Sequence, residues 1–305
     1  MFEILVTEPE YFDKDSIKIL KSIGKVTTKR MKKDELLTKI SNYDILIVRI
    51  ETKLTKEVLE KAKKLKIIGS ATTGLNHIDT DYANKKNIKI INLHGIHTIS
   101  TSEHTIALMF ALVRKIPWAF ENMKKNIWKR YLFIGSELNG KTLGIIGLGR
   151  IGSTVAKYAK ALGMNVIAYD PFVKESSIAK LLPIEKVFKY SDILSLHPML
   201  TKENKGMITF KLLKLMKPTA FLINTSRGEI IDSKALLKTL KLNIISGAAL
   251  DVFPEEPLLK NNIFAAYARK KNNLIITPHI GASTKEAVHI AGMDLAKKVK
   301  TEFNK

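Results

Sequence analysis

The sequence predicts an α/β protein built from two doubly wound, parallel-sheet domains, and three observations support this. Segments typical of strands and of helices alternate from one end of the 305 residues to the other, as in mainly parallel sheets. That length exceeds what one hydrophobic core usually fills, so two domains are expected. A glycine-rich turn between a strand-like and a helix-like segment lies near the middle of the chain.

Apolar runs in the first hundred residues predict strands near 2–7, 44–49, 66–70 and 88–92, and the stretches around them predict helices near 13–23, 33–40, 55–64 and 79–86. A long, largely apolar helix follows in "TSEHTIALMFALVRKIPWAF". Thr101 or Ser102 is its expected N-cap, and Pro117 is expected to disturb its last turns. We expect this helix to lie in a core or at a subunit contact.

A second series of strands is expected near 142–146, 165–169, 192–197, 220–224, 244–250 and 273–277. Helices are expected near 150–162, 175–189, 209–215 and 232–240, with a final helix near 283–300. If that final helix returns to the first domain, the second domain is an insertion in the first.

The composition limits the kinds of partner. A formal charge of +22 attracts polyanions and small anionic substrates alike. The lysines are scattered over helix faces, without a zinc-finger or aromatic RNA-binding motif, so nucleic-acid binding is not expected. No apolar run approaches the roughly 20 residues of a membrane span, and no signal peptide precedes "FEILVT". Zero cysteine suits a reducing compartment, so a cytoplasmic location without membrane partners is expected.

The segment "KTLGIIGLGRIGSTVAKYAKALGMNVIAYDP" contains G-x-G-x-x-G between a strand and a helix, the context of a Rossmann-type dinucleotide site. Gly147 permits a tight turn, Gly149 lets the backbone approach a pyrophosphate, and Gly152 allows close helix–strand packing. Phosphates would lie at the helix N-terminus, where Arg150 either adds charge or is simply solvated. Asp170 ends the second strand, where a carboxylate accepts hydrogen bonds from ribose hydroxyls and repels a 2′-phosphate. This predicts NAD rather than NADP, the alternative being an ordinary strand-end aspartate.

Polar residues follow one predicted strand after another, at the ends where ligands bind in open parallel sheets. They are His197 with the adjacent Pro198, Thr225, Ser226, Arg227, Asp251 and His279. The other histidines (His77, His94, His97, His104 and His289) and His197 show no convincing metal spacing, and none is expected to be a catalyst.

Together with the glycine pattern, "VRIETKLTKEVLEKAKKLKIIGSATTGLNHID", "INTSRGEIID", "AALDVFPEEP" and "TPHIGAST" resemble the D-isomer-specific 2-hydroxyacid dehydrogenases over nearly the whole chain. The resemblance implies a flavodoxin-like substrate-binding domain of residues 1–100 plus 281–305. It implies an inserted Rossmann-type NAD-binding domain of residues 101–280, which includes a dimerisation helix. The active site would lie in the cleft between the domains of a homodimer.

The family's catalytic set carries over to Arg227, Glu256 and His279. His279 would exchange the proton of the substrate hydroxyl, Glu256 would hold the imidazole and favour its protonated form, and Arg227 would clamp the carboxylate with its forked donors. Taken singly, each residue has an ordinary alternative. His279 could be a structural histidine, and Arg227 could simply bond loop carbonyls. Glu256 could be a solvated loop charge, and the adjacent Glu255 could be confused with it. NAD is expected to contact Gly147, Gly149, Arg150, Ile151, Gly152, Asp170, His197, Pro198, Thr225, Ser226 and Asp251, the last at the nicotinamide carboxamide as the resemblance implies.

The substrate side is expected at Arg49, at the backbone loop of Thr72, Thr73 and Gly74, and at Arg227 and His279. "VRIETKLT" is similar to a substrate segment of phosphoglycerate dehydrogenases, yet Ser70 stands where that branch carries arginine. 3-Phosphoglycerate, glycerate, glyoxylate and hydroxypyruvate therefore stay open. The chain ends soon after its closing helix, so no serine-regulated C-terminal domain is expected. An NAD-sensing corepressor and a basic nucleic-acid binder are the alternative functions.

Overall fold

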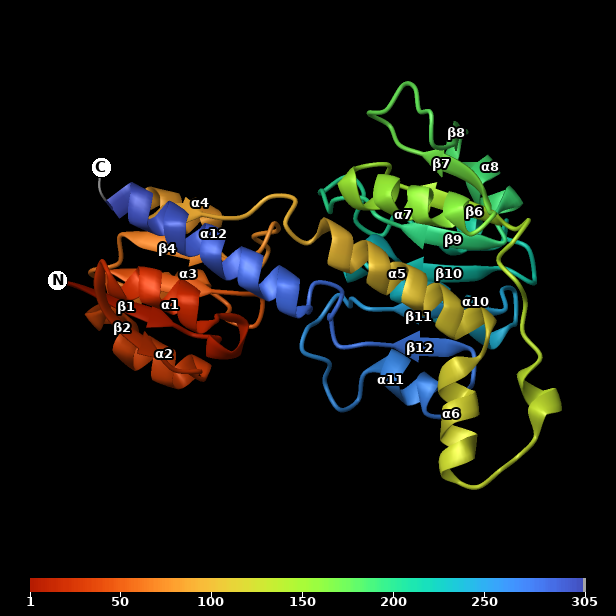
Figure 1. The fold of residues 1–305 in the computed structure, drawn as a ribbon, viewed down its shortest axis with the longest axis horizontal. Helices are drawn as coiled ribbons and strands as arrows, with labels where there is room; N and C mark the ends of the chain where they lie inside the picture. Colours follow the sequence, from red (N-terminus) through yellow and green to blue (C-terminus); the bar gives the residue numbers. More distant parts are fainter. Residues whose placement is uncertain (304–305) are drawn as a thin grey trace. The chain divides into compact units, whose positions relative to one another are not determined.

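The computed structural model describes residues 1–303, and these form two compact units. Unit 1 comprises residues 1–97 and the C-terminal segment from residue 282, and unit 2 comprises residues 98–281. Each unit has its own parallel sheet (Figure 1), so the predicted α/β class with two parallel sheets is confirmed. Within residues 1–303, no helix combines the length and the apolar character needed to cross a bilayer.

The sheet of unit 1 has the strand order β2-β1-β3-β4-β5, the 2-1-3-4-5 order of flavodoxin-like folds. Its strands are β1 (Phe2–Val6), β2 (Gly24–Thr28), β3 (Ile45–Val48), β4 (Ile67–Ser70) and β5 (Lys89–Ile91). Its helices are α1 (Lys14–Lys21), α2 (Lys33–Lys39), α3 (Lys56–Lys61), α4 (Thr80–Lys85) and α12 (Lys285–Phe303). Leu46 belongs to the core cluster beneath α2, α3 and α4, whereas Ile45 belongs to the cluster with α1 and α12. Helices therefore bury both faces of the sheet.

The sheet of unit 2 has the order β12-β11-β10-β9-β6-β7-β8. Its strands are β6 (Thr142–Ile146), β7 (Asn165–Tyr169), β8 (Lys180–Leu181), β9 (Ile193–Leu196), β10 (Phe221–Asn224), β11 (Gly247–Leu250) and β12 (Leu274–Ile276). Its helices are α5 (Thr98–Val113), α6 (Ile116–Lys124), α7 (Arg150–Ala161), α8 (Ile184–Tyr190), α9 (Phe210–Leu213), α10 (Ser233–Lys241) and α11 (Ile263–Ala268). Figure 1 shows α5 and α7 lying along these strands.

The chain order around β6 creates the ligand-binding edge of unit 2. From β6 the chain passes to β7 and β8 on one side, and from β9 it continues to β10, β11 and β12 on the other. This is the Rossmann order, with its switch point between β6 and β9. All paired strands run parallel, so the loops that follow them meet at one edge.

Three expectations about elements were wrong. Strand β2 was not predicted, because "GKVTT" has a single large apolar residue and pairs only at the sheet edge with β1. The expected helix 175–189 begins only at Ile184, after the short strand β8. The expected long helix is two helices. The first, α5, begins at Thr98, so Thr101 and Ser102 lie inside it. Lys115 then adopts a left-handed φ of 55°, and α6 begins at Ile116 with Pro117 in its first turn.

Candidate active site

The glycine loop after β6 uses each of its glycines differently. Gly147 has φ +90°, and a Cβ there would lie 2.7 Å from the Pro198 nitrogen. A Cβ on Gly152 would collide with the carbonyl oxygen of Gly147. Gly149, by contrast, has φ −74° and no atom within 4 Å of its Cβ position. Fold geometry therefore requires glycine at 147 and 152, whereas the space above Gly149 at the N-terminus of α7 is open to a ligand phosphate.

Asp170 lies directly beside this loop. Its Oδ2 accepts a 2.7 Å hydrogen bond from the Leu148 N–H, and its Oδ1 accepts one of 2.8 Å from the Phe172 N–H. A carboxylate can accept further bonds on both oxygens, so it can still bind ribose hydroxyls. Arg150 is exposed, and Ile151 is half-buried in the first turn of α7.

His197 follows β9 on the other side of the switch point. Its Nε2 lies 2.8 Å from the Ser195 Oγ, and its Nδ1 is buried without a hydrogen-bond partner among residues 1–303. Burial lowers the pKa of His197 to about 3, so the ring is neutral. Because His197 and Pro198 contact the Gly147 turn, the unpaired nitrogen offers a polar atom to a dinucleotide at this edge. These features fit NAD.

Two predicted cofactor residues direct their hydroxyls into the protein. Thr105 Oγ1 donates to the Thr101 carbonyl, so the Thr225 hydroxyl must donate across 2.8 Å to Thr105 Oγ1. The Ser226 Oγ donates to Asn224 Oδ1 over 2.9 Å. Side-chain hydrogen bonds from Thr225 to a cofactor would therefore require these contacts to change.

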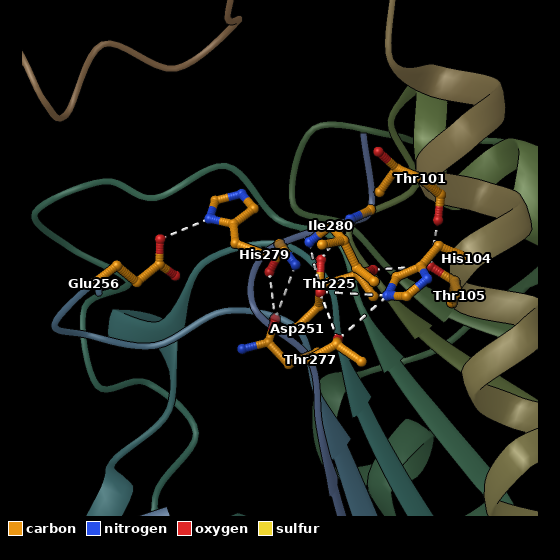
Figure 2. Close-up of polar contacts among 12 residues, drawn as sticks. Thr101, His104, Thr105, Thr225, Asp251, Glu256, Thr277, His279 and Ile280 are labelled. Carbon is orange, nitrogen blue, oxygen red and sulfur yellow. Dashed lines mark hydrogen bonds and ion pairs between the residues drawn. The ribbon is translucent and has the colours of Figure 1, made fainter. Parts of the chain in front are cut away.

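Arg227, Glu256 and His279 follow the neighbouring strands β10, β11 and β12 and lie at the same sheet edge. His279 Nδ1 lies 2.6 Å from Glu256 Oε2, and the other oxygen of Glu256 accepts the Phe253 N–H at 2.8 Å. Figure 2 shows the imidazole pointing to this carboxylate. Since an ionised carboxylate only accepts hydrogen bonds, Nδ1 carries the proton and Nε2 is the nitrogen left to react.

Arg227 is brought towards Glu256 by an unusually close backbone approach. A Cβ on Gly228 would collide with the backbone of Phe253 and Pro254, so the loop after β10 packs directly on the loop that carries Glu256. Burial lowers the pKa of Arg227, and the carboxylates of Glu256 and Glu229 act against that shift. The guanidinium donates to the Ser226 carbonyl over 2.7 Å, which leaves most of its five N–H donors for a ligand.

Asp251 organises the loop that carries His279. Its carboxylate is 1% exposed and accepts hydrogen bonds from Thr277 Oγ1 (2.5 Å), the Ile280 N–H (2.9 Å) and the Gly281 N–H (2.8 Å). His104 Nε2 from α5 lies 3.3 Å from the same group (Figure 2). His279 adopts φ 54° between these anchors, a conformation costing a non-glycine residue about 1–2 kcal/mol. Asp251 thus compensates for strain, a role that the sequence prediction of a nicotinamide contact did not include.

The candidate substrate residue of unit 1 is a buried arginine. Arg49 is 6% exposed and stacks its guanidinium 4.0 Å from the centre of the Tyr11 ring. Its Nη2 donates to the Ala282 carbonyl, and its Nη1 has no hydrogen-bond partner within residues 1–303. Burial lowers the pKa of Arg49, with Tyr11 and Glu8 among the groups that act against it. A buried, unsatisfied guanidinium N–H is a strong attraction for an anion.

Sequence reasoning missed Glu8, which shapes the loop after β3. This carboxylate is 1% exposed and accepts the N–H groups of Arg49 (3.0 Å), Glu51 (3.3 Å) and Thr52 (3.0 Å). Its only sequence signal was its place directly after the apolar run "FEILVT". The contacts of His104 and Thr277 with Asp251 were not predicted from the sequence either.

The loop of Thr72, Thr73 and Gly74 follows β4, next to β3 in the sheet. The N–H groups of Thr73 and Gly74 have no acceptor among the described residues. The structure thus places Arg49 and this loop after adjacent strands of unit 1. Within residues 1–303, no cluster of His, Asp and Glu side chains is arranged to hold a metal ion.

Comparison with known proteins identifies the family. A family model described as the NAD binding domain of D-isomer specific 2-hydroxyacid dehydrogenases matches residues 106–281. Hydroxypyruvate reductase of Thermotoga maritima is 38% identical, over 99% of this chain and 98% of its own length. The chain therefore belongs to the D-isomer specific 2-hydroxyacid dehydrogenase family, as predicted, and unit 2 contains its NAD-binding domain.

Other relatives carry different activities. D-3-phosphoglycerate dehydrogenase of Methanocaldococcus jannaschii is 45% identical over 98% of this chain, which spans 57% of that relative. The chain thus spans a little over half the length of such relatives. D-lactate dehydrogenase of Aquifex aeolicus, solved with NAD and lactic acid, superposes with a TM-score of 0.87 at 30% identity, covering 99% of this chain and 95% of that one.

The contrast between Gly149 and Gly152 predicts two different mutant phenotypes. Gly149→Ala meets no atom and keeps a negative φ, so its stability should stay within about 1 kcal/mol of wild type, while NADH affinity falls because the methyl group occupies the phosphate space. Gly152→Ala should lower stability through its collision with Gly147. Thermal unfolding and NADH fluorescence titration measure both effects. Wild-type NADH affinity in Gly149→Ala would contradict this assignment.

Proposed function

We propose that this chain is an NAD-dependent dehydrogenase of small anionic D-2-hydroxy acids, reducing the matching 2-oxo acids in reverse. The observation that carries the proposal is the 2.6 Å pair of His279 Nδ1 and Glu256 Oε2. This pair lies at the sheet edge that also carries the glycine loop and Arg227.

Oxidation of a 2-hydroxy acid removes a hydride from C2 and a proton from its hydroxyl. Glu256 holds Nδ1 of His279 protonated, so Nε2 accepts the hydroxyl proton as the C2–O bond becomes a carbonyl. In reverse, the imidazolium returns that proton to the C2 oxygen. The chemistry that NAD supplies when bound is acceptance of the hydride.

Arg227 has a separate task in this mechanism. Its planar guanidinium binds the substrate carboxylate and polarises the C2 oxygen, which draws hydride to C2 in the reductive direction. Its burial strengthens both interactions, because the surroundings screen charge less than water does. In unit 1, Arg49 Nη1 and the N–H groups of Thr73 and Gly74 have no acceptor among residues 1–303, and we propose them as further donors for an anionic substrate.

The substrate class in the proposal is a small 2-oxo or 2-hydroxy acid. Relatives are named D-3-phosphoglycerate dehydrogenase, glyoxylate reductase and hydroxypyruvate reductase. The direct experiment is NADH oxidation by the purified chain with glyoxylate, hydroxypyruvate, pyruvate and 3-phosphohydroxypyruvate. Turnover of at least one supports the proposal, and absence of turnover with tight NADH binding would favour a cofactor-sensing module instead.

Replacing His279 should separate chemistry from cofactor binding. His279→Ala and His279→Asn should both lower kcat by about 10²- to 10⁴-fold while NADH affinity stays near the wild-type value. Asparagine is the matched variant, because it tolerates the positive φ at this position better than alanine does. Undiminished turnover in either variant would remove His279 as the proton-exchanging group.

Asp170 should set the choice of cofactor. Asp170→Ser removes the negative charge that would repel a 2′-phosphate and weakens hydrogen bonds to the ribose. The preference for NADH over NADPH, taken as the ratio of kcat/KM values, should fall by about tenfold or more. Asp232→Ser, at the N-cap of α10, is the control because serine preserves that cap. An unchanged ratio in Asp170→Ser argues against its role.

A homodimer belongs to the same proposal. Residues 116–134, here termed the apolar arm, expose several large side chains: Phe120 (62%), Trp128 (73%), Tyr131 (67%) and Ile134 (74%). Such a patch on one segment is typical of a protein interface, and a second copy is the proposed occupant. Trp128→Lys combined with Ile134→Lys should give a monomer by light scattering, whereas Leu242→Lys outside the arm should not. A wild-type monomer would refute this assembly.

A further inference from the structure

Ser70, Thr72 and His77 form a buried hydrogen-bond chain at the end of β4. Ser70 is 0% exposed, and Thr72 and His77 are each 6% exposed. The Ser70 Oγ lies 3.1 Å from His77 Nε2 and 2.7 Å from Thr72 Oγ1. Thr72 Oγ1 in turn donates to the Gly74 carbonyl over 2.8 Å. Three side chains therefore link the end of the strand to the carbonyl of the loop.

The terminal carbonyl fixes the direction of every bond in this chain. A carbonyl oxygen can only accept, so the single hydroxyl proton of Thr72 is used on Gly74. Thr72 Oγ1 must then accept from the Ser70 hydroxyl, whose oxygen must accept from His77 Nε2–H. The polarity runs one way, from His77 through Ser70 and Thr72 to Gly74.

This hydrogen-bond chain acts on the loop that contains the N–H groups of Thr73 and Gly74. It holds the Gly74 carbonyl on the protein side, while the N–H groups of Thr73 and Gly74 have no acceptor among the described residues. Two further bonds anchor the loop: the Thr72 carbonyl accepts the Leu93 N–H, and the Thr73 carbonyl accepts from Asn92 Nδ2. Because the carbonyls of Thr72, Thr73 and Gly74 all accept hydrogen bonds, the loop offers its N–H groups as donors for an anion.

We propose that Ser70 and His77 are positioning residues for substrate, which orient the Thr72–Gly74 loop through this one-way chain so that its N–H groups bind the substrate carboxylate. This inference rests on the proposed function. Ser70 itself cannot touch the substrate, because it is fully buried and its hydroxyl is bonded on both sides. Ser70 stands where the resemblance to phosphoglycerate dehydrogenases implies an arginine, so this position supplies no cation and instead orients the loop.

The kinetics of Ser70→Ala test the role of this hydrogen-bond chain. Loss of one buried hydroxyl should raise KM for the reduced 2-oxo acid about fivefold to tenfold. The kcat value should stay within about twofold, because binding in the ground state and in the transition state is weakened equally. NADH affinity should not change, since the NAD-binding domain lies in unit 2. Ser16→Ala is the matched control: it removes another fully buried serine hydroxyl of unit 1, at α1.

The direction of the chain gives a readout that does not depend on activity. In protein labelled with ¹⁵N-histidine, NMR should show a proton on Nε2 of His77, with His77→Gln used to assign the signal. Ser70→Ala should shift that resonance, whereas Ser16→Ala should leave it in place. A His77 ring with unprotonated Nε2 would overturn the proposal.

The kinetic outcomes separate this inference from the proposed function. If the wild type reduces a 2-oxo acid and Ser70→Ala has an unchanged KM, the proposed role of Ser70 is wrong. The proposed function is then still supported. If Ser70→Ala raises KM and also lowers kcat and NADH affinity, the substitution destabilises the protein generally. That result would equally overturn the proposed role of Ser70. If the wild type reduces no 2-oxo acid, the proposed function fails by itself. The His77 resonance still decides whether the hydrogen bonds run from His77 through Ser70 to Thr72.

Discussion

The buried carboxylate of Asp251 is the interaction on which the proposed chemistry depends. It binds a hydroxyl and two backbone N–H groups of the segment from Thr277 to Gly281, and His104 approaches it from α5 (Figure 2). Burial acts to raise the pKa of Asp251, but hydrogen bonds from His104, Thr277 and Ile280 outweigh it and lower the pKa. The group is therefore an anion at neutral pH, and His279 keeps its left-handed backbone and its contact with Glu256 because this anion secures the loop.

The same device recurs at other strand ends. Glu8 gathers three N–H groups of the loop that carries Arg49, and Asp170 joins the glycine loop to the turn after β7. A carboxylate bonded to backbone N–H groups is a strong, directional constraint, since charged hydrogen bonds are about twice as strong as neutral ones. Carboxylates thus shape the loops that carry Arg49 and His279, two basic groups that the proposed function assigns to the substrate.

The sequence predicted the strands of unit 2, apart from the two-residue strand β8, to within about three residues, because buried parallel strands are continuous apolar runs bounded by polar turns. It missed β2, whose edge position leaves it with lysine and threonine instead of apolar residues. Gly147, Arg227 and His279 were recognisable because each follows such a run within a few positions. Glu8 follows one too, but its partners lie some 40 residues away in the chain, so its role required the fold. The direction of the His77–Ser70–Thr72 hydrogen bonds likewise depends on the contact between the Thr72 hydroxyl and the Gly74 carbonyl. No sequence pattern predicts that contact.

A crystal structure with NADH and a non-reacting 2-oxo acid analogue tests the central claim most directly. We expect His279 Nε2 within hydrogen-bond distance of the analogue's C2 oxygen, Arg227 on its carboxylate, and Asp251 still bonded to the Ile280 and Gly281 N–H groups. An analogue bound beside the nicotinamide with His279 turned away from it, or with the His279 loop released from Asp251, would contradict these roles.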